Sequence, residues 1–235
     1  MAKRQGMSGR EQVLEELSAA LGHRFSRPEL LEEALRHRSA AHERGVPSSE
    51  RLEFLGDAAL SHAVALLIFD RWPAASEGDL TRARAALVRE GSLAALAERL
   101  ELPSALELGS GLKPTSSGPA MLADAFEAVL GALLLDGGWR SFRAAVNRLF
   151  VPLLAALDPA ELAIEEAKST LQELAQRRGL GLPIYREVET RGPAHRRTFV
   201  YEVEFDGRVL ARGEGSSKKA AQHEAARRAL ETLEP

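Results

Sequence analysis

The segment SSERLEFLGDAAL, residues 48–60, places three acidic side chains in a stretch that otherwise has the composition of a buried helix. Glu50, Glu53 and Asp57 are three and four residues apart, so they share one face of a helix. The remaining positions are almost all apolar, and a helix that is apolar on every side is normally buried. Burying several carboxylates together is costly, because each loses its hydration and repels the others. This face therefore needs either solvent or positive charge beside it.

Two interpretations of the acidic face stay open at this level. In the first, it is a solvent-facing stripe with Arg51 and other arginines as ion-pair partners. In the second, it meets another acidic face from MLADAFEAVLG, residues 121–131, where Asp124 and Glu127 are again three residues apart among apolar neighbours. The spacing alone does not establish that the two helices face each other. If they do, four carboxylates converge: Glu53, Asp57, Asp124 and Glu127.

The available side chains narrow what such a cluster can bind. The chain has no cysteine, which excludes disulfides and thiolate chemistry and leaves oxygen or histidine nitrogen as metal ligands. Carboxylate oxygens suit a hard cation such as Mg²⁺. Two such ions about 3.5–4 Å apart recur in phosphodiester hydrolysis, where one lowers the pKa of a bound water and the other stabilises the leaving oxygen. The four carboxylates are therefore candidate Mg²⁺ ligands.

The composition is that of a globular protein. The chain has 235 residues, 45% hydrophobic and 28% charged, which suits one large domain or two small ones. A net charge of −3 argues against a generally basic nucleic-acid coat but leaves room for local basic surfaces. The start, MAKRQGMSGREQ, lacks the apolar core of a secretory signal, and the most apolar run, AVALLIF, is too short to span a bilayer. We expect a cytoplasmic protein with no membrane partner.

The hydrophobic pattern changes along the chain. Residues 1–157 show helical periodicity without a strand pattern, which predicts an all-helical domain. Residues 158–166 are interpreted as a linker. Residues 167–235 contain a helical segment, three segments with strand character broken by glycines, and a final amphipathic helix. This order predicts a small α+β domain (α-β-β-β-α), with a three-stranded antiparallel sheet and both helices on one face.

The acidic segments also carry a family resemblance. ERLEFLGDAAL resembles the signature segment of the ribonuclease III family, and LADAFEAVLGALLLDGG resembles its second catalytic segment. LRHRSAAHE and GDLTRARAALVREGSLA match the family's layout in the same order. The resemblance covers essentially the whole chain, since bacterial members end in a double-stranded-RNA-binding domain. It implies a Mg²⁺-dependent endoribonuclease, with Mn²⁺ as a substitute, that cuts duplex RNA. The products would carry 5′-phosphate and 3′-hydroxyl ends with short 3′ overhangs. The implied roles are ribosomal RNA processing and the turnover of structured mRNA.

Carried over position by position, the resemblance assigns roles to the acidic residues. It implies that Asp57 and Glu127 are catalytic and that Glu50 lies beside the site. It also implies a homodimer of nuclease domains, for which Phe54 is a candidate interface residue; an ordinary core phenylalanine is the alternative. The implied Mg²⁺ ligands are Glu53, Asp57, Asp124 and Glu127.

Several neighbouring residues have two alternative roles or depart from the family pattern. Ser49 and Ala58 stand where many members have asparagine and serine, but neither position is a metal ligand. His37 is either a general base or a structural histidine that caps a helix. Three arginines either neutralise the carboxylates and contact RNA, or form a solvated face with local ion pairs: Arg82, Arg84 and Arg89.

The C-terminal segment offers three features that suit duplex RNA, which proteins read by its shape, 2′-hydroxyls and phosphates. GSSKKAAQHEAA puts two lysines at a helix start, where free N–H groups and the dipole attract phosphate. A polar face of the first helix suits 2′-hydroxyls, and the loop RGPAHRR presents His195. The candidate RNA-binding residues are Ser169, Gln172, Gln176, His195, Ser217, Lys218 and Lys219.

Together these features resemble the double-stranded-RNA-binding domain. The resemblance implies that Gln172, Gln176 and His195 lie at minor grooves and that the residues before the last helix contact the phosphates between them. Ser216 stands where related domains often have another lysine. We therefore expect weaker phosphate attraction and a shallower salt dependence than in fully basic relatives.

Two rival functions remain at this level. One is a non-catalytic duplex-RNA-binding or ribosome-associated protein on the same scaffold; retention of all four acids favours catalysis over it. The other is a helical metal-dependent phosphohydrolase of small nucleotides, which would leave the C-terminal domain unexplained.

Overall fold

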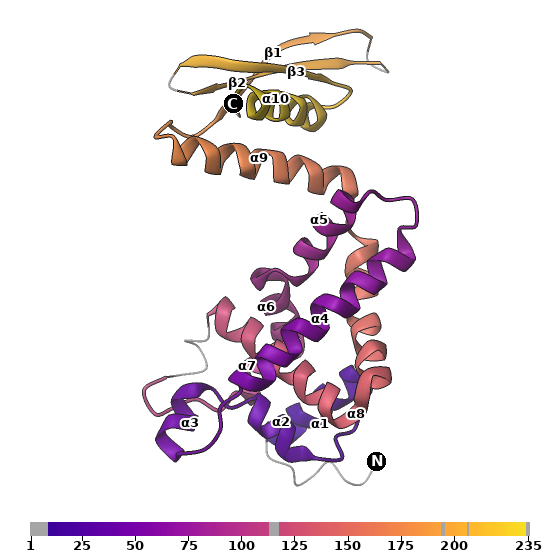
Figure 1. Cartoon of the computed structure of the whole chain (residues 1–235), viewed down its shortest axis with the longest axis vertical. Helices are drawn as coiled ribbons and strands as arrows, with labels where there is room; N and C mark the ends of the chain where they lie inside the picture. The colour runs from indigo at the N-terminus through magenta and orange to yellow at the C-terminus, as the bar shows by residue number, and fades with distance from the viewer. Residues whose placement is uncertain (1–8, 113–117, 194–195, 206, 234–235) are drawn as a thin grey trace. The chain divides into compact units, whose positions relative to one another are not determined.

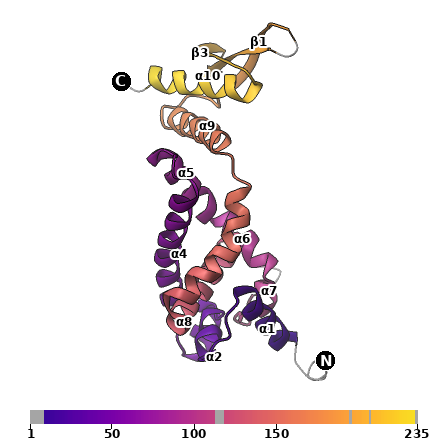
Figure 2. The same cartoon turned by 90° about the vertical axis from the view of Figure 1, so that its right-hand side faces the viewer.

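A computed structural model describes residues 9–112, 118–193, 196–205 and 207–233 (Figures 1 and 2). The chain divides into two compact units, Met1–Ala156 and Leu157–Pro235. The described part of the first unit is helical, and the second has the order α-β-β-β-α, so the predicted fold class is confirmed.

The first unit is built from eight helices in its described residues (Figure 1). The central pair is α4 and α8, which pack along each other. Fully buried Phe126, Phe142 and Phe150 of α8 supply the bulk of the core around them. The helices are α1 Gly9–Leu21, α2 Pro28–Ala34, α3 Arg38–Arg44, α4 Glu50–Arg71, α5 Glu77–Val88, α6 Glu90–Arg99, α7 Leu102–Ala105 and α8 Pro119–Ala155.

Two glycines let α4 and α8 touch backbone to backbone. A Cβ atom on Gly56 of α4 would lie 1.8 Å from the carbonyl oxygen of Glu127, and one on Gly131 of α8 would lie 2.1 Å from the carbonyl oxygen of Leu52. No side chain fits at either position, because Cβ atoms do not approach backbone atoms that closely. The acidic residues flank these glycines on both helices, so the close crossing draws their carboxylates together.

Helix α8 is interrupted at Gly138, whose φ of 68° is left-handed, and a second helical stretch follows directly. Just before the break, Asp136 accepts hydrogen bonds from the backbone N–H groups of Ser26 and Arg27, at 2.9 Å each, and lies 2.6 Å from Nε2 of His23. Burial opposes ionisation of Asp136, but these hydrogen bonds outweigh it and lower its pKa to about 2. The carboxylate thus fastens the segment between α1 and α2 to the break.

Among the described residues, α4 is the one helix long and apolar enough, by length and composition alone, to cross a membrane. A core helix of a globular domain passes the same test. Helix α4 buries Leu60, Val64 and Ile68 and packs against α8, which is how a core helix behaves. Its acidic face and its exposed apolar face are considered with the site.

The second unit is a three-stranded antiparallel sheet in the order β1-β2-β3, with two helices packed on it (Figure 2). Gly213 and Gly215 of β3 let α10 approach closely, since a Cβ atom at either would overlap the backbone of that helix. Leu171 of α9 shares a core with Val203 and Phe205 of β2. The elements are α9 Pro159–Arg177, β1 Ile184–Arg191, β2 Thr198–Phe205, β3 Arg208–Gly215 and α10 Lys218–Leu233.

The segment predicted to be a linker, residues 158–166, is helical from Pro159 onward and forms the first turns of α9. Pro159 at the first helical position and Glu161 in the first turn both favour a helix start. The functional boundaries of the domains stay predictions.

The glycine crossing yields a stability prediction. Gly131→Ala should destabilise the protein by about 3 kcal/mol, because the added methyl group overlaps backbone atoms of α4 and forces the helices apart. Gly91→Ala is the matched control: nothing lies within 4 Å of its Cβ position in α6, so it should leave stability unchanged or slightly raised. Urea unfolding measures both, and equal stability of Gly131→Ala and the parent chain would contradict the tight crossing.

Candidate functional site

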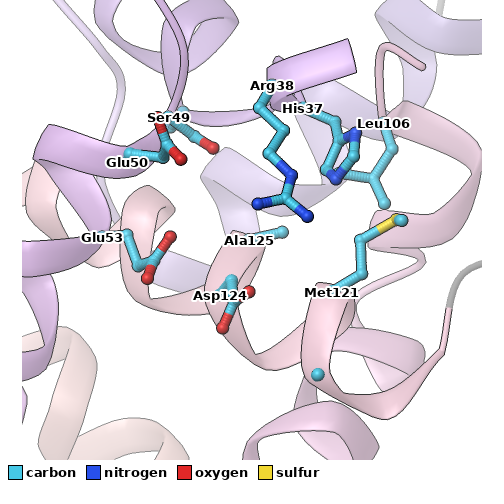
Figure 3. A pocket seen from close by; sticks show the side chains of 11 residues that line it. His37, Arg38, Ser49, Glu50, Glu53, Leu106, Met121, Asp124 and Ala125 are labelled. Atoms are coloured by element: carbon cyan, nitrogen blue, oxygen red, sulfur yellow. The ribbon is translucent and has the colours of Figure 1, made fainter. Parts of the chain in front are cut away.

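Acidic residues from α4 and α8 face a common cavity (Figure 3). Glu50 and Glu53 come from the first turn of α4, and Asp124 comes from α8. Together with His37 and Arg38 they line a space of about 460 Å³. The two acidic faces therefore do meet, which the sequence spacing alone left open.

The electrostatics of these groups tie all four predicted ligands into one cluster. Burial raises the pKa of Glu127 to about 7, assisted by the negative charges of Asp57, Asp124 and Glu53. Burial also raises the pKa of Glu53, with further contributions from Asp124, Glu50 and Asp57. The carboxylates thus repel one another across the crossing of α4 and α8, and positive charge between them would relieve this repulsion.

The donor set fits a hard divalent cation. Every candidate ligand is a carboxylate oxygen, as Mg²⁺ prefers. In the described part of the chain, no three acidic or histidine side chains close around a single point as metal ligands do. Of the four predicted ligands, Glu53 and Asp124 line the cavity. Asp57 and Glu127 do not line it, and they join the cluster through the charge interactions that raise the pKa of Glu127. The residues are suitable in type and neighbourhood, and their roles as ligands stay predictions.

Two charged residues at the cavity were not among the predicted site residues. Burial raises the pKa of Asp124, and the next contribution comes from Glu90 at the start of α6, a further carboxylate close to the cluster. Arg38 points into the cavity between the acidic side chains (Figure 3) and opposes the upward pKa shifts of Glu53 and Asp124. Neither residue has a sequence spacing that relates it to the acids, so only the fold brings them together.

His37 acts as a helix cap. Its Nδ1 accepts a hydrogen bond of 3.2 Å from the backbone N–H of Ser39, in the first turn of α3. Burial, followed by the charge of Arg38, lowers the pKa of His37. This geometry supports the structural interpretation, because the capping nitrogen is already engaged.

Two of the three arginines of the α5 region make local contacts. Arg82 pairs with Asp79 of its own helix at 2.7 Å, and Nε of Arg89 donates to Ser92 at 3.3 Å. These contacts agree with the interpretation as a solvated face with local ion pairs. The charge of Arg38 opposes the raised pKa of both Glu53 and Asp124, and His37 acts on Asp124 in the same direction.

An apolar strip runs along the solvent-facing side of α4. Phe54 is 79% exposed and Phe69 is 67% exposed, so the alternative interpretation of Phe54 as a core residue is wrong. Leu66 is also exposed on α4, and Leu135 and Trp139 are exposed on α8. Large exposed apolar groups that gather on one element are typical of a protein interface.

The predicted RNA-binding residues of the second unit lie on two helices. Ser169, Gln172 and Gln176 are exposed and share one face of α9. The hydroxyl of Ser217 accepts a hydrogen bond of 3.1 Å from the N–H of Ala220 at the start of α10. His195 lies outside the described residues.

Both predicted phosphate-binding lysines are held by carboxylates. Lys218 lies 2.7 Å from Glu187 of β1, and Lys219 pairs with Glu161 of α9. Lys168, which was not predicted, adds a third ammonium group: it donates to Gln222 at 2.5 Å, and burial and then Lys219 lower its pKa. An RNA phosphate that paired with these lysines would compete with the two carboxylates.

Two family models match the chain. The model described as ribonuclease-III-like matches residues 27–154, and the model described as the double-stranded RNA binding motif matches residues 167–233. Relatives match over nearly the whole length. Ribonuclease 3 of Ralstonia pickettii is 42% identical over 222 residues, covering 93% of this chain and 84% of the relative. Ribonuclease 3 of Thiobacillus denitrificans is 45% identical over 222 residues, covering 93% and 96%.

Solved structures match the first unit. The nuclease domain of ribonuclease III from Campylobacter jejuni superposes with a TM-score of 0.56 at 34% identity, over 62% of this chain and 98% of that one. A second structure of that domain, which concerns flexibility in a region involved in dimer formation, gives 0.55 at 35% identity, over 59% and 96%.

A helical nuclease domain followed by a double-stranded-RNA-binding domain defines a two-domain nuclease of duplex RNA. The chain belongs to the ribonuclease III family. The predicted family and the predicted enzyme class, a ribonuclease III-type endoribonuclease, are thereby confirmed.

The raised pKa of Glu127 predicts a pH-dependent stability. Its folded pKa of about 7 exceeds the ordinary value of 4.5, so the stability that the protonated side chain contributes is complete below about pH 4.5 and is lost as pH rises through 7. Glu127→Gln should therefore be more stable than the parent chain at pH 8 in EDTA, by about 1 kcal/mol after solvent screening. The gain in stability should be smaller at pH 5. Thermal unfolding measures this, with exposed Glu98→Gln as control; a difference independent of pH would contradict it.

Proposed function

We propose that the chain is a Mg²⁺-dependent endoribonuclease that hydrolyses phosphodiester bonds of double-stranded RNA, with Mn²⁺ as a substitute cofactor. The observation that carries the proposal is the meeting of carboxylates from α4 and α8 in one cavity, on a chain that also has a double-stranded-RNA-binding domain. An acidic cavity alone repels a phosphodiester, so the chemistry requires cations held by these residues.

Four carboxylates would hold the metal: Glu53, Asp57, Asp124 and Glu127. When held there, Mg²⁺ would supply an activated water and would stabilise the leaving oxygen. Asp57 and Glu127 are proposed as the catalytic pair, since Gly56, next to Asp57, approaches the backbone of Glu127 at the glycine crossing, and the charge of Asp57 is the largest charge contribution to the raised pKa of Glu127. Glu50, at the cavity rim, is proposed to lie beside the ions and contact RNA or water.

The second unit is proposed to bind RNA by shape. The exposed polar face of α9, with Ser169, Gln172 and Gln176, suits minor-groove 2′-hydroxyls. Ser217, Lys218 and Lys219 at the start of α10 suit phosphates, and His195 is proposed for a second minor groove. Because these contacts carry little base information, sequence preference should be weak.

The products are proposed to have 5′-phosphate and 3′-hydroxyl ends with short 3′ overhangs. The proposed setting is the cytoplasm, with no membrane partner, and the proposed substrates are ribosomal RNA precursors and structured mRNAs. The family's established chemistry motivates these details, and no individual residue selects among RNA substrates.

A homodimer through the nuclease domain is also proposed, with one acidic cluster for each RNA strand. The exposed strip led by Phe54 and Phe69 supplies an apolar surface for it. Sedimentation velocity of the full chain should give one species of twice the chain mass at micromolar concentration. Because the contact is apolar, Phe69→Ser should shift this species toward the monomer, whereas exposed Glu98→Gln should not. A monomeric parent chain would contradict the proposal.

A cleavage assay separates the proposed function from its rivals. The chain is incubated with long duplex RNA, single-stranded RNA and duplex DNA, each with Mg²⁺ or with EDTA. Cutting of duplex RNA that requires Mg²⁺ is expected, since both the acidic cluster and the RNA-binding domain are in place. Binding without cutting would instead support a non-catalytic RNA-binding protein, and turnover of free nucleotides would support a small-nucleotide phosphohydrolase.

The matched variant in that assay is Glu127→Gln. It should bind duplex RNA as the parent chain does, because Glu127 lies in the nuclease unit, and cleave it at least about 100-fold more slowly. Gel-shift and single-turnover measurements separate the two effects. Equal loss of binding and cleavage would argue against a metal role for Glu127.

A further inference from the structure

The sequence RHR, residues 36–38, supplies three cationic or titratable side chains in a row, and two are committed to the fold. Arg36 donates from Nε to Glu107 at 3.2 Å and from its guanidinium to the carbonyl oxygen of Pro47 at 3.1 Å. His37 caps α3 through Ser39. Both residues are fully explained by these structural contacts.

Arg38 differs from its neighbours. Its exposed side chain makes no hydrogen bond or ion pair within the described residues, yet its guanidinium reaches into the acidic cavity (Figure 3). It opposes the upward pKa shifts of Glu53 and Asp124 through space without closing on either carboxylate. The guanidinium thus lies near the acids, and its planar set of N–H donors stays available to a ligand.

The backbone that carries Arg38 is fixed on both sides. The N–H of His37 donates to the carbonyl oxygen of Glu107 at 3.0 Å, and the hydroxyl of Ser39 accepts from the N–H of Gly109 at 2.9 Å. The backbone at Arg38 is therefore already ordered, which limits the backbone entropy lost when its side chain binds a ligand. A planar guanidinium with free donors matches the non-bridging oxygens of a phosphate.

We propose that Arg38 binds a non-bridging oxygen of the RNA phosphate that enters the acidic cavity, and that without RNA it opposes divalent-cation binding there. This inference rests on the proposed function, because it assigns a substrate contact to the same cavity. A phosphodiester entering a cluster of carboxylates meets repulsion, and Arg38 offsets part of it from the protein side. When the guanidinium pairs with the phosphate, its charge is neutralised and no longer opposes cation binding by the carboxylates.

The test combines cleavage kinetics with a measurement that needs no RNA. With Arg38→Gln, kcat/KM for duplex RNA should fall about 10- to 100-fold at saturating Mg²⁺, because a charge-assisted contact to the reacting phosphate is lost. In calorimetry with Mn²⁺ and no RNA, the same variant should bind the ion more tightly, on the order of 3- to 10-fold, because a nearby positive charge is gone. A purely structural role would not tighten ion binding.

Two variants complete the design. Arg38→Lys keeps the charge but loses the planar donor pair, so its kcat/KM should lie between the parent and Arg38→Gln, with ion binding close to the parent. Arg99→Gln removes an exposed charge on α6 and should change neither measurement. Unchanged kcat/KM in Arg38→Gln, or weakened Mn²⁺ binding, would overturn the role of Arg38 while the parent still cleaves. A parent chain that does not cleave duplex RNA would instead overturn the proposed function.

Discussion

The backbone contact between α4 and α8 is the constraint on which the nuclease unit depends. Gly56 and Gly131 remove the side chains that would separate the helices, and each helix then presses against a carbonyl of the other. Three acidic residues lie within a few positions of this contact: Glu53 and Asp57 in α4, and Glu127 in α8. The crossing thus brings together like charges that would otherwise stay apart, and apolar burial along both helices must offset their repulsion.

The two units handle charge in opposite ways. In the nuclease unit, carboxylates gather with few cations, so the pKa of Glu127 rises to about 7 and the cluster is suited to divalent metal. In the RNA-binding unit, the lysines proposed to bind phosphate are already paired: Lys218 with Glu187 and Lys219 with Glu161. Glu187 also accepts a hydrogen bond from Tyr201, so an RNA phosphate that paired with Lys218 would compete with a well-bonded carboxylate. This pairing reduces the positive charge of the surface at the start of α10, in addition to the reduction expected from Ser216 in place of a lysine.

The sequence predicted much of this arrangement because its signals are local. Spacing alone put Glu53 and Asp57 on one helical face. Alternation, or enrichment in β-branched and aromatic residues, between glycines identified the strands of the second unit. What it did not predict depends on contacts between distant segments. The approach of the acidic faces depends on Gly131, which carries no chemical signal of its own. Folding also brings Arg38 into the cavity and the charge of Glu90 close to Asp124. Lys168 beside Lys219 is a similar case.

The central claim is that the crossing of α4 and α8 forms a divalent-cation site. Anomalous diffraction from crystals of the full chain soaked in Mn²⁺ tests it most directly. The account predicts anomalous peaks between the two helices, ligated by carboxylates from both Asp57 and Glu127. Peaks confined to other surfaces, or none at Mn²⁺ concentrations that support cleavage of duplex RNA, would contradict it.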